Sequence, residues 1–210
     1  MFSNSKNFLG CCLCFFLFLF FLNDSSLFAT DNKGCNRIGM YLEYKPAYFY
    51  PQDKVFRDIY SGGYITLGEI GYFVNCNYFL WLESGYFRKE GTINGIDLNV
   101  KSTITQVPLA LGLGYAYQIK PRFDMYVKIA PNYLYTNTSQ KSPFLEPKIS
   151  KHTAGVTFGL GGKIKFSWFL VDLFANYRYD KKTVHDYISD ITFHRYLGGF
   201  DFGVGIGGRF

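Results

Sequence analysis

From residue 37 to the end of the chain, apolar and polar side chains alternate with a period of two, which predicts strands that have one apolar face. The segments are ten residues long or a little longer, about the length that a tilted strand needs to cross a bilayer. The clearest is Ser102–Gln118, in which one face carries Leu and Tyr and the other carries Ala and Gly. The predicted strands are Arg37–Tyr50, Tyr64–Val74, Tyr78–Arg88, Ser102–Gln118, Phe123–Tyr135, His152–Phe166, Trp168–Tyr179 and Tyr196–Phe210.

The connections between these strands alternate in length. Tight turns are predicted at residues 75–77, at 119–122 and around Ser167. Long loops are predicted at Pro51–Gly63, Lys89–Lys101, Thr136–Lys151 and Asp180–Arg195. Bacterial outer-membrane barrels have short periplasmic turns and longer outer loops, and an even number of strands leaves no unpaired edge in lipid. The pattern therefore predicts an all-β fold, an eight-stranded antiparallel up-and-down transmembrane β-barrel.

Composition supports a membrane barrel over a soluble one. Aromatic residues make up 20% of the chain, and charged residues 18%, against about 25% in ordinary soluble domains. Large apolar residues share one strand face and Gly, Ala and charges the other, which is the inverse of a soluble barrel. Interfacial aromatic residues fall near the predicted strand ends: Tyr48, Tyr50, Tyr64, Tyr78, Tyr86, Trp168, Tyr177, Tyr179 and Tyr196. The net charge of +6 is spread along the chain without a dense basic run, which argues against nucleic-acid binding.

The first 29 residues have the order of a secretory signal peptide. Lys6 supplies a basic start, Phe8–Leu22 is a continuous apolar block, and a polar patch leads to Ala29. We expect cleavage near Ala29–Thr30, although Leu27 stands where a small residue is usual. The predicted organisation is a signal peptide at 1–29, a periplasmic N-terminal segment at 30–36 and the barrel at 37–210.

Cleavage would remove Cys11, Cys12 and Cys14 and leave Cys35 and Cys76. An exported chain with two thiols can oxidise them. The strand assignment places both on the periplasmic rim, so a disulfide that ties down the N-terminus is one hypothesis. Two free or intermolecular thiols are the alternative.

Charged residues also occupy the inward positions of the predicted strands. Eight strands enclose a lumen just wide enough for side chains, and isolated charges there would be costly. We therefore predict a network of buried ion pairs that plugs the lumen; a gated narrow pore or a catalytic carboxylate is the alternative. The predicted members are Glu43, Glu69, Glu83, Lys128, Lys163, Lys165, Asp172, Arg178, Asp201 and Arg209.

Catalytic signatures are weak. None of the three His residues begins a His-x-Ser pair, and the Gly-rich stretches alternate with apolar residues and open no helix. The last long loop gathers possible catalytic or metal-binding groups, but their spacing matches no strong signature: His185, Asp186, Ser189, Asp190 and His194. A solvated loop explains them more simply, so we predict no enzyme, no cofactor and no metal.

The terminal segment FDFGVGIGGRF resembles the C-terminal assembly signal of Gram-negative outer-membrane barrels, with Phe202, Val204, Ile206 and the final Phe210 in the pattern. Gly208 departs from it, because a bulkier residue is usual there. The segment TQVPLALGLGYAY is similar to a strand common in OmpA/OmpX-like barrels. The resemblance covers about residues 37–210, and we expect no periplasmic domain after the barrel.

This resemblance implies recognition by the barrel-assembly machinery, a monomer surrounded by outer-membrane lipids and lipopolysaccharide, and contacts with host or surface molecules through the long loops. The expected function is a structural, adhesin-like role in the outer membrane. Two rivals are a narrow channel for small or hydrophobic solutes and a lipid A-modifying enzyme.

Overall fold

The computed structural model describes residues 39–94, 99–141, 148–186 and 191–210. The predicted signal peptide at 1–29 and the segment at 30–36 lie outside the described residues. The barrel strands are β1 (Gly39–Pro51), β2 (Gly63–Phe73), β3 (Tyr78–Asn94), β4 (Asn99–Lys120), β5 (Phe123–Lys141), β6 (Lys148–Phe166), β7 (Phe169–Tyr179) and β10 (Gly199–Arg209). A short helix α2 (Lys54–Tyr60) follows β1, and a separate hairpin of β8 (Lys181–Asp186) and β9 (Ile191–Tyr196) stands between β7 and β10.

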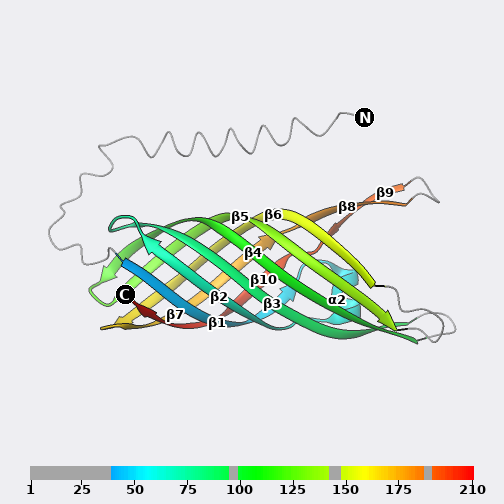
Figure 1. Ribbon diagram of the computed structural model, residues 1–210, viewed down its shortest axis with the longest axis horizontal. Helices are drawn as coiled ribbons and strands as arrows, with labels where there is room; N and C mark the ends of the chain where they lie inside the picture. The colour runs from blue at the N-terminus through cyan, green and yellow to red at the C-terminus, as the bar shows by residue number, and fades with distance from the viewer. Residues whose placement is uncertain (1–38, 95–98, 142–147, 187–190) are drawn as a thin grey trace, which may run out of the picture. The chain divides into compact units, whose positions relative to one another are not determined.

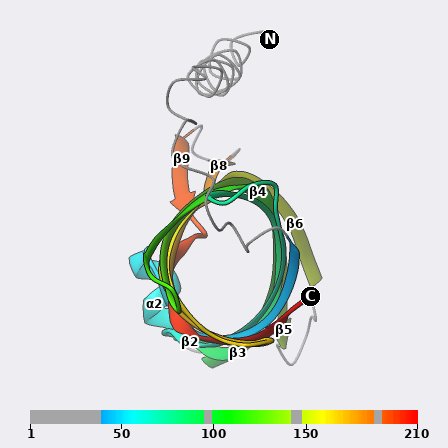
Figure 2. The same ribbon diagram turned by 90° about the vertical axis from the view of Figure 1, so that its left-hand side faces the viewer.

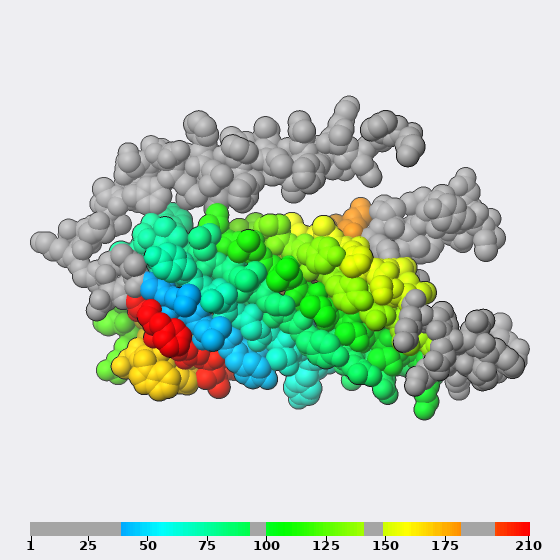
Figure 3. All heavy atoms as spheres, in the orientation of Figure 1, coloured from blue at the N-terminus to red at the C-terminus, as the bar shows by residue number. Residues whose placement is uncertain are grey.

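These eight strands form a closed antiparallel barrel in the order β1-β10-β7-β6-β5-β4-β3-β2. Viewed from one end, they make a complete ring (Figure 2). The ring closes where β1 pairs with β10, from Tyr41 opposite Arg209 to Pro51 opposite Gly199. In Figure 3 this seam is visible as blue residues of β1 lying against red residues of β10. The prediction of a closed eight-stranded up-and-down barrel is confirmed.

Alternation of side chains explains why these segments form strands of a barrel. From Tyr41 to Pro51, buried and exposed residues alternate without interruption, and the same is true throughout β2. The Gly-rich sequence of β2 obscured this pattern, yet its strand lies within one residue of the predicted bounds. None of the described helices is both long and apolar enough to span a membrane.

The short connections gather at one end of the barrel, which we call the short-turn end; the opposite end is the loop end (Figure 1). At the turn between β2 and β3, the side-chain oxygen of Asn75 accepts hydrogen bonds from the backbone N–H groups of Asn77 and Tyr78 at 2.9 and 2.8 Å. Ser167 turns the chain from β6 to β7 with φ of 50°. Asn and Ser suit such turns because their side chains bond nearby backbone groups.

At the loop end, the prediction of long loops at Lys89–Lys101 and Thr136–Lys151 is wrong, because most residues of both ranges belong to barrel strands. The pair β3–β4 continues to Asn94 and Asn99, and the pair β5–β6 continues to Lys141 and Lys148. These four strands have 17, 22, 19 and 19 residues, whereas β2, β7 and β10 have 11 each. The barrel therefore has a tall wall, β3–β6, and a short wall formed by β7, β10, β1 and β2.

Above the short wall, two elements replace the expected loops. The predicted loop Pro51–Gly63 contains α2, which Asp53 caps by accepting a hydrogen bond from the N–H of Phe56 at 2.9 Å. The predicted loop Asp180–Arg195 contains most of the β8–β9 hairpin, and Tyr196 ends that hairpin instead of beginning the last barrel strand.

Candidate functional site

The barrel interior changes in character from one end to the other, as the inward residues of β1 show. From the short-turn end these are Tyr41, Glu43, Lys45, Ala47 and Phe49, and each is no more than 4% exposed. An aromatic layer therefore comes first, charges occupy the middle, and a second aromatic layer lies toward the loop end.

Each aromatic layer is built from several strands. At the short-turn end, Tyr41 contacts the rings of Phe73 and Phe79. At the loop end, Phe49 packs edge-on against Phe87 and against Phe56 of α2. The residues of this second aromatic layer are Phe49, Phe56, Tyr60 and Phe87. The hydroxyls of Tyr60 and Ser102 are hydrogen-bonded at 2.6 Å, which fixes α2 to the tall wall.

Between these layers lies a cluster of buried ion pairs, which we call the central cluster. Its members are Glu43, Lys45, Glu69, Glu83, Lys128, Lys163 and Asp172, all less than 7% exposed. Lys45 lies 2.9 Å from carboxylate oxygens of both Glu69 and Asp172. Lys128 bridges Glu69 and Glu83, and Lys163 bonds Glu43.

Neutral groups complete the cluster. The hydroxyl of Tyr41 donates to Glu69 and that of Tyr126 donates to Asp172, both at 2.8 Å. The ammonium group of Lys128 lies 4.0 Å from the ring centroid of Trp81. Buried charges require this kind of pairing and hydrogen bonding, because desolvation otherwise costs several kcal/mol for each ion, on the order of the whole stability of a domain.

Two further pairs flank the central cluster. Toward the loop end, Arg178 makes a two-point contact with Asp201, with N–O distances of 2.8 and 3.0 Å, and its guanidinium lies over Phe49. Toward the short-turn end, Lys165 pairs with Asp124 at 2.9 Å and is 17% exposed.

The structure thus brings most of the predicted lumen residues together in pairs. Arg209 lies opposite Tyr41 in the β1–β10 register and is only partly buried. Lys45 and Asp124 were absent from the predicted network, although strand alternation already placed both on the inward face. Tyr41, Tyr126 and Asn176 were missed as partners because the prediction considered charges alone.

Asp180 follows β7 directly and is fully buried. Burial raises the pKa of its carboxyl group, while the charge of Arg178 acts in the opposite direction. Gly155 makes room for this arrangement, because a Cβ at that position would lie 2.5 Å from the Asp180 carboxylate. The inward glycine is therefore what admits the Asp180 side chain.

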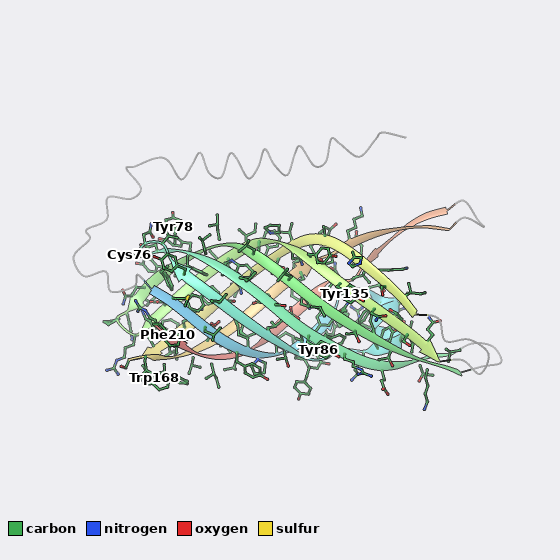
Figure 4. All side chains as sticks on the ribbon, viewed as in Figure 1. Cys76, Tyr78, Tyr86, Tyr135, Trp168 and Phe210 are labelled. Atoms are coloured by element: carbon green, nitrogen blue, oxygen red, sulfur yellow. The ribbon has the colours of Figure 1, made fainter. Side chains whose placement is uncertain are left out.

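The outside of the barrel carries an apolar belt. Its members are exposed by 40% or more and come from seven of the eight strands: Leu42, Leu80, Leu82, Leu109, Leu111, Val127, Ile129, Phe158, Leu160, Leu173, Phe202, Val204 and Ile206. Aromatic side chains border it. Figure 4 places Tyr78, Trp168 and Phe210 near the short-turn end and Tyr86 and Tyr135 nearer the loop end.

The possible catalytic or metal-binding groups of the last long loop lie where side chains are not described. His185, Asp186 and His194 are on the strands of the β8–β9 hairpin, and Ser189 and Asp190 lie outside the described residues.

Cys76 is in the turn between β2 and β3 and is disulfide-bonded. Cys35, its predicted partner, lies outside the described residues.

No family model matches the chain, and no curated protein matches it in sequence. Two of the solved structures that are similar to it illustrate the shared fold. Neisserial surface protein A has a TM-score of 0.53 at 12% identity, over 82% of this chain and 97% of that one. A major outer membrane protein from Thermus thermophilus has a TM-score of 0.50 at 11% identity, over 81% and 99%. The expected likeness to small outer-membrane β-barrels is confirmed at the level of the fold.

Proposed function

We propose that this protein is an outer-membrane β-barrel with a structural, surface-contacting role, and that its lumen is a filled core and not a pore. The observation that carries the proposal is the inversion of the barrel. Large apolar side chains cover the outside, while seven charged side chains meet in the middle of the inside. The apolar outside does not suit water, because a large exposed apolar surface marks an interaction site. The charges inside are buried, and they need dedicated partners.

The dimensions fit a bilayer. A strand of 11 residues, such as β2 or β10, rises about 36 Å and spans about 26 Å when tilted by about 45°. The apolar band of outer-membrane barrels is about 25 Å tall. The short wall therefore matches the hydrocarbon layer, and the tall wall extends beyond it at the loop end.

Orientation follows from the connections. Barrels of this kind keep short turns in the periplasm and longer segments outside. The chain would enter the periplasm by its signal peptide and present α2, the β8–β9 hairpin and the ends of β3–β6 on the cell surface. The last strand, with Phe202, Val204, Ile206 and Phe210, would be the part that the barrel-assembly machinery recognises.

The central cluster supports a non-conducting lumen. Its side chains bond across the barrel between β1, β2, β3, β5, β6 and β7, and an aromatic layer covers it on both sides. The purified barrel in a planar bilayer should therefore give no discrete current steps. Regular single-channel steps would support the porin-like alternative instead.

The surface-contacting role can be tested by shortening the β8–β9 hairpin and, separately, the connection between β5 and β6. Replacing residues 182–195 by a two-residue turn removes most of the β8–β9 hairpin, and removing residues 142–147 shortens only the connection between β5 and β6. Bacteria that display the wild-type protein should adhere to host cells or surface molecules, and the hairpin deletion should reduce that adhesion. Equal adhesion by correctly assembled wild-type and deleted barrels would count against the adhesin-like role.

A further inference from the structure

The helix α2 lies at the loop end of the barrel and joins β1 to β2 (Figure 1). It has seven residues, which is too short for an isolated helix to be stable in water. Its buried residues are Phe56 and Tyr60, and both belong to the second aromatic layer. The helix therefore depends on its packing against the barrel, and its attachment can be followed contact by contact.

The tall wall is covered by α2 on β3 and β4 but not on β5. Tyr60 is hydrogen-bonded to Ser102 of β4, and a Cβ on Gly91 of β3 would lie 2.2 Å from the carbonyl oxygen of Ile59. Ser102 is 1% exposed, whereas Gln140, which is opposite Ser102 on β5, is only half-buried. The helix thus shelters one part of the loop end and leaves the neighbouring part open.

The residue that follows α2 has a strained backbone. Ser61 has φ of 58° and ψ of −167°, close to a region of backbone conformation that essentially only glycine occupies. Its N–H donates to the carbonyl oxygen of Arg57 at 2.8 Å. The next residue is pressed against β1, because a Cβ on Gly62 would lie 2.7 Å from the carbonyl oxygen of Phe49. Detachment of α2 would let Ser61 relax, so the strain favours an open position.

The contacts that oppose this strain come from two side chains of α2. Phe56 packs on Phe49 and Phe87, with ring centroids 6.1 and 6.5 Å apart. The hydroxyls of Tyr60 and Ser102 are 2.6 Å apart. The closed position is therefore a balance between strain at the end of the helix and a small set of contacts along it. Segments with few buried contacts open locally before the rest of a protein unfolds.

We propose that α2 is a hinged lid, which detaches from the barrel as a unit while the strands stay paired. Opening uncovers Phe49 and Phe87 at the loop end. The guanidinium of Arg178, paired with Asp201, lies 4.8 Å from the ring centroid of Phe49. The lid thus controls the access of water and small solutes to this buried pair. The inference goes beyond the proposed function, because it needs a closed barrel but no particular membrane location or surface partner.

Hydrogen–deuterium exchange of the detergent-folded protein, measured by mass spectrometry, tests the lid. The N–H groups of Arg57 and Ser61 are hydrogen-bonded within α2 and its cap, so they exchange only when the helix opens. A peptide that covers residues 53–61 should therefore exchange at least about tenfold faster than peptides from β4.

Variants should shift this exchange in opposite directions. Ser61→Gly should slow it about fivefold, because glycine removes the strain of the closed position. Gly91→Ala should accelerate it about tenfold, because the added Cβ meets the backbone of Ile59. Tyr60→Phe keeps the ring and loses the hydrogen bond to Ser102, and should accelerate it about fivefold. Thr92→Ala, at an exposed position of β3, is the matched control and should change nothing.

Exchange in β4 should be the same in all of these variants, which checks that the barrel stays folded. Equal exchange of α2 and β4 in the wild-type protein, or faster exchange of α2 in Ser61→Gly, would overturn the lid and leave the proposed function intact. Rapid exchange throughout β4 of the wild-type protein would contradict the barrel and the lid together.

Discussion

Lys128 illustrates how much a single buried charge contributes to this barrel. It lies between Glu69 and Glu83, within the central cluster and over the ring of Trp81. Its removal would leave the Glu83 carboxylate buried and bonded only through the amide of Asn176. Breaking a buried pair from one side is much more costly than losing an exposed pair.

Lys128→Gln should therefore lower the free energy of unfolding by about 3–5 kcal/mol. Lys101→Gln, at an exposed position of β4, should change it by no more than about 0.5 kcal/mol. Urea unfolding from lipid vesicles, followed by the fluorescence of the two Trp residues, measures both. Equal losses in the two variants would contradict the central role of the cluster.

The buried carboxyl group of Asp180 makes the stability of the folded protein depend on pH, in a direction that can be predicted. Because burial raises the pKa of its carboxyl group, the folded protein holds this proton more tightly than the unfolded chain does. The stability that the protonated carboxyl group contributes is fully present below the pKa of Asp in the unfolded chain, about 4. It is lost as the pH rises through the pKa of Asp180 in the folded protein. Asp180→Asn should thus be more stable than wild type at pH 7, and this advantage should vanish at acidic pH.

Urea midpoints at several pH values measure this effect, with Asp58→Asn on the exposed face of α2 as the matched control. An advantage of Asp180→Asn that grew toward acidic pH would mean that the carboxylate is held in its charged form.

At the scale of the element, Gly68 and Gly71 of β2 lie in different settings. A Cβ on Gly71 would lie 2.1 Å from the ring of Tyr41, whereas a Cβ on Gly68 would have nothing within 4 Å. Gly71→Ala should therefore displace Tyr41 and its hydrogen bond to Glu69, and cost about 1–3 kcal/mol. Gly68→Ala should cost nothing measurable in the same urea titration, and similar losses for both would argue against the close packing of Tyr41.

The sequence predicted the strands well at the short-turn end, because Asn75, Asn77, Pro121 and Ser167 mark tight turns there. It failed at the loop end for a physical reason. The thickness of a bilayer limits only the part of a strand that crosses lipid. Outside the lipid the hydrogen-bonded ladder continues with polar outward residues, as at Thr103 and Thr105.

Strand alternation also predicted which charges point inward, but not which of them pair. Glu43 and Lys163 are 120 residues apart in the chain and meet only because the barrel closes with a particular register. Register is set by the whole ring of strands, so no single segment contains that information.

At the scale of the whole molecule, Cys76 in the turn between β2 and β3 is disulfide-bonded. We propose Cys35 as the partner, since it is the only other cysteine left after cleavage near Ala29. Mass spectrometry of the mature chain under non-reducing conditions should show a peptide pair that contains both cysteines and a mass lower by two hydrogens. Two free thiols in the exported protein would exclude the bond.

Electrophoretic mobility is the most direct test of whether the protein is a closed barrel with an apolar outside. Residues 30–210 are folded into detergent and run on SDS gels with and without boiling, beside a circular dichroism spectrum. A closed barrel should give a β-type spectrum and two clearly different mobilities, because a closed hydrogen-bonded ring resists SDS until it is heated. A single mobility without a β signal would contradict the barrel and everything argued from it.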